Sequence, residues 1–344
     1  MKVLRSFPKM GIFFAFFIVV GCNPVNKIDF NEIDALILEY DPHQDMNYSV
    51  PIKGSVLIKM KSGELINTDE KRITVTTQNI QIRGEKGTII TSVKPTKFSQ
   101  NIVPVKMSIS NSEGAVFSNW DTLRLNFSAP LNLDFRQPKA GNGLTGSDGG
   151  QALLFRFGKT GYNGENGRNG VNGAELIIYV WKDSSQYFFH VHNMTLNETY
   201  YYQSTNERFS INASGGTGGD GGDGGTGGNG KDAENYNNKT KSAGDGGDGG
   251  NGGNAGFGGN GGSVMCYIHP SALAIQNNIS ISVNPGNPGQ PGKGGLGGKP
   301  GKNTDGLTPA NQGRNGINGV TSTFGQRGIS TISQLDFDYS QLYR

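Results

Sequence analysis

Apolar and polar residues alternate along the first third of the chain. The alternation falls into short runs, among them Val56–Met60, Ile73–Val75, Ile80–Ile82, Val103–Ile109, Leu123–Phe127 and Leu131–Phe135. Such a period of two predicts antiparallel strands that bury one face and expose the other. Turn-forming sequences such as Lys61-Ser62-Gly63-Glu64 separate the runs. About seven short strands of this kind predict a β-sandwich over residues 35–136.

The strand pattern of residues 35–136 resembles that of bacterial immunoglobulin-like modules. The cysteine pair of antibody domains is missing, so the resemblance depends on the strand pattern. It implies an N-terminal immunoglobulin-like β-sandwich.

Beyond residue 136 the pattern changes to a glycine repeat with a period of three. Most of the 55 glycines lie between Gly141 and Gly319. Glycine occupies every third position from Gly158 to Gly173, and Gly215–Gly230 reads Gly-Gly-X throughout. Gly246–Gly262 repeats Gly-Gly-X with Ala255 as the one lapse, and further runs occupy 286–301 and 313–319.

A period of three matches a polyproline-II type helix, which has three residues per turn and no internal hydrogen bonds. Glycine at every third position leaves one edge of such a helix without side chains, and Gly-Gly-X leaves two edges bare. Neighbouring helices can then approach closely and pair their amides with each other. The repeat resembles the polyglycine-II bundles of some phage tail-fibre tips and glycine-rich antifreeze proteins. This resemblance implies a rigid bundle within residues 137–344.

Two other structures fit a glycine repeat. A collagen-like homotrimer fits Gly286-Asn287-Pro288-Gly289, but collagen is long, uninterrupted and richer in proline. The second alternative is a disordered segment, because glycine loses much conformational entropy when it is ordered. Apolar segments that abut the runs argue against disorder, at Ala174–Trp181, Phe209–Ile211, Val264–Ile268 and Ile279–Val283. We therefore expect an all-β fold, in which the sandwich is followed by a β-sheet continuous with a polyglycine-II bundle whose segments run up and down.

The N-terminus has the features of a targeting segment. Lys2, Arg5 and Lys9 precede an apolar run that is too short to cross a bilayer. The segment ends in Val19-Val20-Gly21-Cys22, which resembles a bacterial lipobox. The resemblance implies a signal peptide at 1–21, lipid on Cys22 and a tether at 22–34. In lipoproteins generally, the asparagine that follows the cysteine favours the outer membrane, and the sequence does not resolve which side of that membrane the protein faces.

Composition limits the remaining possibilities. A formal charge of +3 over 344 residues is too small to indicate nucleic-acid binding. Cys266 is the only other cysteine, so lipid on Cys22 would leave no intrachain disulfide, and we expect Cys266 to be a small buried apolar residue.

Two groups of residues are candidate metal ligands. Asp220, Asp223, Asp245 and Asp248 lie in the glycine runs, and the start of the run superficially resembles a calcium-binding nonapeptide repeat. The period of three disagrees with that repeat, so we expect solvated aspartates. His190 and His192 alternate on one strand face without a nearby acidic or cysteine partner, so we expect a sheet face and no metal site.

The sequence contains no nucleophile elbow, phosphate-binding loop or zinc-protease motif. We therefore expect neither an enzyme nor a cofactor. Asp121-Thr122-Leu123 resembles the O-glycan acceptor of some diderm bacteria, which makes Thr122 a candidate glycosylation site.

These features predict a non-enzymatic cell-envelope lipoprotein with a structural or adhesive role, held to a membrane by its N-terminal lipid. An outer-membrane protein or a glycan is the expected partner. The alternative is an accessory subunit of an outer-membrane transport or secretion complex. Ice or glycan binding by the ranked X residues is a third hypothesis, and their mixed chemistry argues against a regular ice-matching lattice.

Overall fold

The computed structural model of the chain describes residues 28–48, 50–68, 74–83, 88–91, 94–98, 100–110, 114–152, 157–236, 239–304 and 306–343. These residues form β-strands in several sheets, and helical structure among them is limited to short 3-10 segments. The expected all-β fold is confirmed. The proposed signal peptide and Cys22 lie outside the described residues. None of the helices in the described ranges is long and apolar enough to cross a membrane.

Two sheets share a hydrophobic core in the N-terminal part of the chain. One has the order β1-β2-β6-β5, with β3 also paired to β2, and the other has the order β4-β7-β8. Their bounds are β1 Ile33–Tyr40, β2 Ile52–Met60, β3 Leu65–Asn67, β4 Thr74–Gln78, β5 Ile80–Arg83, β6 Thr88–Thr91, β7 Ile102–Ser110 and β8 Val116–Arg124. The alternation seen in the sequence places Val103, Val105, Met107 and Ile109 of β7 in the core.

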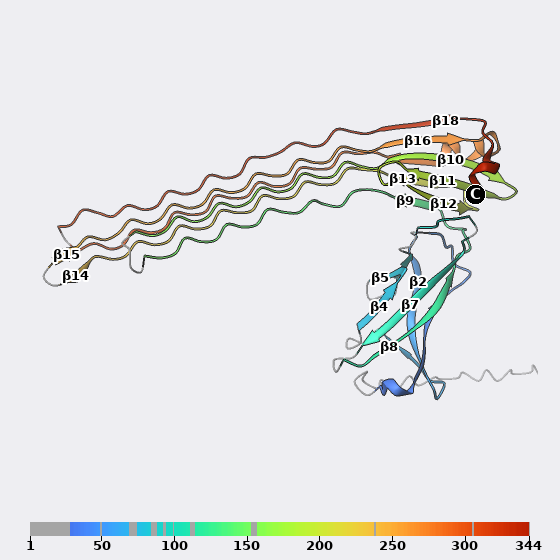
Figure 1. Cartoon of the computed structure of the whole chain (residues 1–344), viewed down its shortest axis with the longest axis horizontal. Helices are drawn as coiled ribbons and strands as arrows, with labels where there is room; N and C mark the ends of the chain where they lie inside the picture. Colours follow the sequence, from blue (N-terminus) through green and yellow to red (C-terminus); the bar gives the residue numbers. More distant parts are fainter. Residues whose placement is uncertain are drawn as a thin grey trace, which may run out of the picture.

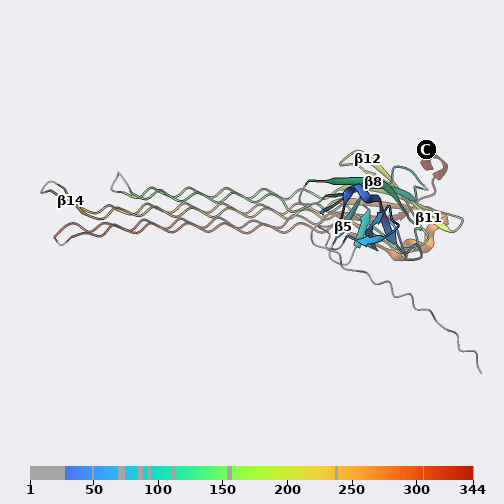
Figure 2. The same cartoon turned by 90° about the horizontal axis from the view of Figure 1, so that it is seen from below.

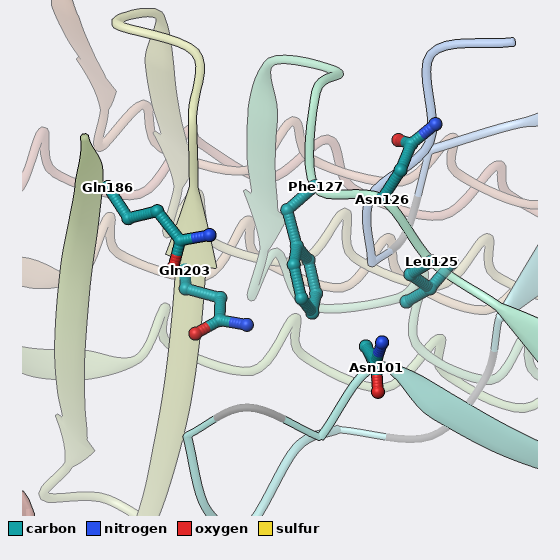
Figure 3. Close-up of a pocket in the computed structure, with 6 residues that line it drawn as sticks. All are labelled: Asn101, Leu125, Asn126, Phe127, Gln186 and Gln203. Atoms are coloured by element: carbon teal, nitrogen blue, oxygen red, sulfur yellow. The ribbon is translucent and has the colours of Figure 1, made fainter. Parts of the chain in front are cut away.

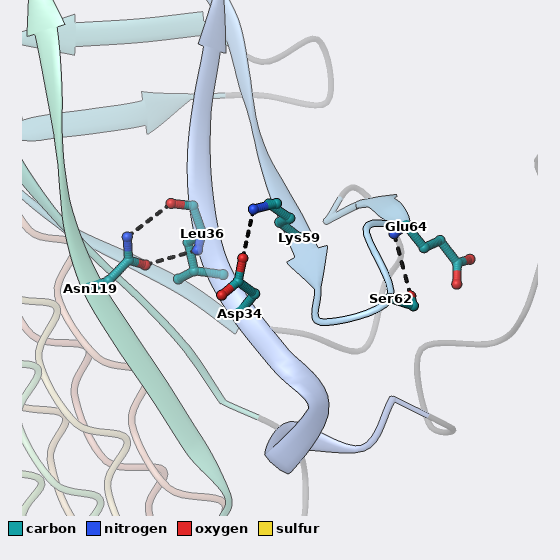
Figure 4. A network of polar contacts seen from close by, with 6 residues as sticks. All are labelled: Asp34, Leu36, Lys59, Ser62, Glu64 and Asn119. Carbon is teal, nitrogen blue, oxygen red and sulfur yellow. Dashed lines mark hydrogen bonds and ion pairs between the residues drawn. The ribbon is translucent and has the colours of Figure 1, made fainter.

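Side chains connect the two N-terminal sheets where strand β8 passes strand β1. The Asn119 carboxamide accepts a hydrogen bond from the Leu36 amide at 2.9 Å and donates to the Leu36 carbonyl at 3.0 Å (Figure 4). Asp121 accepts from the Leu38 amide at 2.8 Å. These bonds satisfy main-chain groups of β1 that would otherwise form an open sheet edge.

The C-terminal part begins with two further sheets. Five strands have the order β12-β11-β10-β16-β18, and three have the order β17-β13-β9. Their bounds are β9 Leu131–Asp134, β10 Glu175–Asp183, β11 Gln186–Asn193, β12 Glu198–Ser204, β13 Phe209–Asn212, β16 Ser263–Ile268, β17 Ile279–Ser282 and β18 Ile329–Gln334. Phe189 of β11 meets Phe209 of β13, with 4.4 Å between ring centroids, in the shared core.

Strand β9 differs from its sequence-based assignment. Residues 131–135 were expected to belong to the sandwich, but β9 pairs in parallel with β13. Alternation reports only that one face of a strand is buried, and it does not identify the neighbouring strand.

Six glycine-rich segments extend from the paired sheets, and we call them legs 1 to 6 (Figure 1). Legs 1, 3 and 5 leave β9, β13 and β17, and legs 2, 4 and 6 return into β10, β16 and β18. The legs are 135–152, 157–174, 213–233, 242–262, 283–304 and 308–328. The short strands β14 (Glu234–Tyr236) and β15 (Lys239–Lys241) join legs 3 and 4 at the far end.

Main-chain hydrogen bonds arrange the legs in two layers. Legs 1, 3 and 5 lie parallel in one layer, because Gly143 donates to Asp220 at 2.7 Å and Gly221 donates to Gln290 at 2.8 Å. Legs 2, 4 and 6 form the second layer in the same way. Bonds between the layers join antiparallel legs, such as Gly222 to Glu165 at 2.8 Å. Figure 2 shows the legs running alongside one another away from the sheets. The amides therefore pair between legs, which satisfies backbone groups that have no partner within a leg.

In legs 3 and 4, which have a neighbour on each side, the three residues of a triplet have different hydrogen-bonding roles, and these roles define three rows that continue along the other legs. Leading-row amides donate to the next leg of the same layer, as Gly218 does to Asn287. Trailing-row amides donate to the opposite layer, as Gly219 does to Arg168. Outer-row residues carry the exposed X side chains, such as Asp223 and Thr226.

The glycine pattern of each leg matches its place in the bundle. Legs 3 and 4 have neighbours on both sides of their layer, and they are the Gly-Gly-X legs. Legs 1 and 2 have glycine in the leading row alone over most of their length, because no leg precedes them in their layers. Ser322 replaces glycine in the row of leg 6 that contains Gly316, Gly319 and Gly325, and its hydroxyl donates to the carbonyl of Ala255, the non-glycine residue of leg 4.

An aromatic cluster joins the N-terminal sheets to the outer face of the five-stranded sheet. Phe98 lies 5.2 Å from Trp181 and 5.0 Å from Tyr201, measured between ring centroids. The C-terminal 3-10 segment Tyr339–Tyr343 covers the cluster, and the Trp181 indole donates to the Tyr343 hydroxyl at 3.0 Å. Buried Asn47 adds a polar link by donating to the carbonyls of Ala129 and Gln203.

Cys266 faces the core from β16 and is 1% exposed, as the sequence predicted. Burial raises the pKa of its thiol to about 12, so little reactive thiolate exists at neutral pH. We expect an aromatic disulfide reagent to modify Cys266 only after unfolding. A matched control is Met265→Cys combined with Cys266→Ala, because Met265 is 37% exposed on the same strand. Equal reaction rates for the two native proteins would contradict this expectation.

Candidate functional site

The two broad faces of the bundle carry ordered arrays of outward side chains. Legs 2, 4 and 6 present one face, on which Asn163, Asn251 and Ile317 form a row across the layer. Legs 1, 3 and 5 present the other, on which Asn142, Asp220 and Gln290 form an equivalent row. Along a leg these rows recur every third residue, as at Asn163 and Asn166. The side chains of each face therefore lie in regular rows, and main-chain hydrogen bonds between the legs fix the spacing of those rows.

Asparagine and aspartate side chains satisfy the outer-row amides. The Asn163 carboxamide oxygen accepts from the Asn251 amide at 2.8 Å, and the Asn251 oxygen accepts from the Ile317 amide at 2.9 Å. The same bond recurs from Asn166 to Asn254 and from Asn254 to Val320. Each such residue thus completes the hydrogen bonding of the neighbouring leg, which glycine and leucine at that position cannot do.

The four aspartates of the glycine runs have this same role. Asp220, Asp223, Asp245 and Asp248 accept main-chain amides of the next leg at 2.6–2.8 Å. The expectation of simply solvated X positions was therefore incomplete, because each carboxylate keeps one oxygen on a neighbouring leg. The described residues contain no cluster of three or more histidine, cysteine or acidic side chains suited to a metal ion.

Asp220 also pairs with Lys139 of leg 1 across the layer. The hydrogen bond from Lys139 is the main cause that lowers the pKa of this carboxyl, and the amide of Gln290 adds to it. The charge and the amide therefore both favour the ionised carboxylate.

The lowered pKa of Asp220 predicts how pH affects the stability of the bundle. A depressed folded-state pKa contributes stability above the unfolded value, near 3.8, and that stability is lost as pH falls through the folded value. Asp220→Asn keeps the amide acceptor and removes the charge, so it should lose a small amount of stability at pH 7 and less at pH 3. Thermal melts at the two pH values measure this difference. An equal loss at both would show that the ion pair contributes nothing.

His190 and His192 lie on the outer face of the five-stranded sheet. His190 sits between Tyr179 and Tyr201, with ring centroids 6.0 and 5.2 Å away. Burial lowers the pKa of His190, and nearby His192 lowers it further, so both causes favour the neutral imidazole. His192 bonds Thr199 at 3.0 Å. The pair thus forms part of an aromatic sheet face, as expected from the sequence.

One cavity lies at the junction of the N-terminal sheets and the five-stranded sheet. Its volume is about 410 Å³, and Leu125, Phe127, Asn101, Gln186 and Gln203 line it together with Asn126 (Figure 3). The Asn126 carboxamide is engaged elsewhere, because it donates to Gln44 and accepts from Met46. The lining is uncharged and carries carboxamides, which hydrogen-bond neutral polar groups.

Of the two candidate modification sites, the structure describes Thr122 but not Cys22. Thr122 is exposed on β8, and its amide donates to the Asp121 carboxylate at 2.7 Å. Cys22 lies outside the described residues. Sequence reasoning missed the asparagine ladders, although their signal was present as Asn163, Asn166, Asn169 and Asn172 beside successive glycines.

Comparisons with protein families, with curated proteins and with solved structures found no match to this chain.

Proposed function

We propose that this protein is a non-enzymatic envelope lipoprotein that displays a rigid, flat-faced bundle. We call this bundle of legs 1 to 6 the blade. The observation that carries the proposal is the hydrogen-bond network between the six legs, which fixes the backbone positions of the outer-row residues relative to one another. A rigid scaffold lowers the entropy cost when an extended partner binds. A structural or adhesive role uses this property directly.

The proposed fold of the blade is a polyglycine-II bundle, attached to an immunoglobulin-like sandwich. Support for the bundle comes from the period of three, the amides paired between legs and the absence of room for Cβ atoms between them. Support for the sandwich comes from two antiparallel sheets with alternating buried positions. Slow amide exchange across residues 215–301 is the expected result, and exchange at free-peptide rates would remove the rigid blade.

Lipid on Cys22 would hold the protein on the outer membrane. Replacing Cys22 by serine should move the protein from the membrane to the soluble fraction, and the intact mass of the wild type should include a diacylglyceryl group. An unlipidated, soluble wild type would exclude the anchor. Intact mass also tests Thr122, because Thr122→Ala should remove any added sugar.

The proposed partner of the blade is a glycan that binds the face of legs 2, 4 and 6, because the carboxamides on that face can pair with sugar hydroxyl groups. Binding of the purified full chain to envelope polysaccharides is the direct test. Substituting Asn163, Asn166 and Asn169 by alanine should weaken binding, whereas the same number of substitutions at Thr145, Thr226 and Leu296 on the other face should not. If the wild type bound cells, glycans and matrix no more strongly than background, the adhesive role would be contradicted.

A second candidate role is an accessory subunit of an outer-membrane complex. The edge strand β18 favours it, because all six of its residues are exposed and they include Ile329 at 69%. An open edge with apolar side chains is suited to a protein partner. Ile329→Lys with Ile332→Lys should abolish copurification of a stoichiometric partner from detergent, and absence of such a partner with the wild type would exclude this role.

A further inference from the structure

The two long side edges of the bundle differ from its interior in a systematic way. Inside the bundle, leading and trailing rows are almost entirely glycine, because a Cβ would strike the next leg. A Cβ on Gly249 would lie 2.1 Å from the Gly295 carbonyl oxygen, and one on Gly250 would lie 1.9 Å from that of Tyr162. A further leg could therefore dock only against an edge that is glycine and has free amides.

The edge formed by legs 5 and 6 lacks free leading-row amides in leg 5. The residues of leg 5 that correspond to Gly218 and Gly221 of leg 3 are Pro288 and Pro291. Proline has no N–H, and its ring occupies the direction in which that hydrogen would point. Pro285 and Pro300 continue the row.

The two glycines in that row have their amides occupied. Gly294 donates to the Asn318 side chain at 2.9 Å, and Gly297 donates to the Asn315 side chain at 2.8 Å. In leg 6 the leading row carries side chains throughout, where leg 4 has glycine or Ala255. These residues are Gln312, Asn315, Asn318, Thr321, Phe324 and Arg327.

The opposite edge, formed by legs 1 and 2, is blocked by bulk. Its trailing row corresponds to Gly247, Gly250 and Gly253 of leg 4, and in leg 2 it carries large exposed side chains. They are Lys159, Tyr162, Glu165, Arg168 and Val171. Leu144 and Ser147 occupy the same row in leg 1.

We propose that these edge residues act as stops that prevent a second copy of the chain from extending the bundle sideways. Without them, the legs 5–6 edge of one copy would match the legs 1–2 edge of the next, because donors of one edge face acceptors of the other. Such a head-to-tail contact does not close on itself, and it generates open filaments. Natural sheet proteins protect their edges with proline, charge and bulk for the same reason.

The test uses two variants, each of which opens one edge of the full chain. The first variant has Leu144, Ser147, Tyr162, Glu165 and Arg168 replaced by glycine. The second variant has Pro288, Pro291, Asn315, Asn318 and Thr321 replaced by glycine. A matched control carries five glycine substitutions on the outer rows, at Thr145, Thr226, Lys293, Leu296 and Arg314.

Native mass spectrometry from detergent should find the wild type, the control and each variant alone as single chains. Mixing the two variants should give a one-to-one dimer, because each supplies one open edge and retains one closed edge. Combining all ten edge substitutions in one chain should give filaments visible by electron microscopy. Amide exchange across residues 215–301 reports whether each variant keeps its bundle.

Three results would overturn the proposal. The first is a mixture that stays monomeric although both bundles remain protected from exchange. The second is lateral assembly of the wild type or of the outer-row control. The third is loss of the bundle in either variant, which would show that the edge residues stabilise the fold of one chain and do not act as stops.

Discussion

Replacing Gly222 by alanine is expected to destabilise the glycine bundle by more than about 3 kcal/mol, at or beyond the upper end of ordinary overpacking. The added Cβ would lie 2.0 Å from the Leu144 carbonyl oxygen, which is held in a main-chain bond to Glu165. No flexible side chain is available to move aside, so the legs themselves would have to separate. Amide exchange of legs 1 to 4 measures the loss.

The matched control for Gly222→Ala is Thr226→Ala in the same leg. Thr226 belongs to the outer row and is exposed. Its main-chain N–H donates a hydrogen bond to the Asp148 carboxylate, and this bond does not involve the Thr226 side chain. This substitution should change stability by less than about 0.5 kcal/mol, as is usual for exposed positions. Similar protection from exchange in both variants would show that the legs are not packed at main-chain contact.

Trp181→Ala is expected to cost about 3–5 kcal/mol, the range for removing a large buried aromatic side chain. Trp181 is fully buried and stacks on Phe188 and Tyr339, with 5.7 Å between each pair of ring centroids. Its loss also removes the donor to Tyr343. The C-terminal segment should therefore detach, and limited proteolysis after Tyr339 or Tyr343 would detect this.

Trp120→Ala provides the comparison for Trp181→Ala, because Trp120 is 58% exposed on β8. We expect little change in melting temperature and no faster cleavage of the C-terminus. The Trp120→Ala protein also leaves Trp181 as the only indole, so its fluorescence should keep the blue-shifted emission of a buried tryptophan. Equal destabilisation by the two alanine variants would contradict the assigned role of the aromatic cluster.

The sequence predicted many of the individual strands and glycine-rich segments, but few of the pairings between them. Period-two alternation identified β2, β5 and β7, and apolar segments beside the glycine runs marked where β10, β16 and β17 lie. The run Leu123–Phe127 was wrong as a strand, because β8 ends at Arg124 and Phe127 has a positive φ. The partner of β9 was missed, because burial of one face is the same in either sheet.

The ladder of outer-row side chains was missed for a related physical reason. Asp245 and Asn251 look like solvated residues until a leg 66 positions away in the sequence is placed beside them. The glycine pattern indicates the position of each leg in its layer. Gly-Gly-X legs lie in the middle of a layer, and legs with mainly one glycine per triplet lie at its edge. The proline row of leg 5 then marks the last leg of its layer.

The replacement of an apolar core by paired amides in the legs has a calorimetric consequence. Exposure of apolar surface raises the heat capacity on unfolding, and exposure of peptide groups lowers it. The bundle exposes mainly peptide when it opens, so its heat-capacity increment should be near zero and its stability should fall almost linearly with temperature. The sheets around Ile178 and Phe189 should follow the usual curved profile, so cooling that weakens their packing would leave the blade comparatively unaffected.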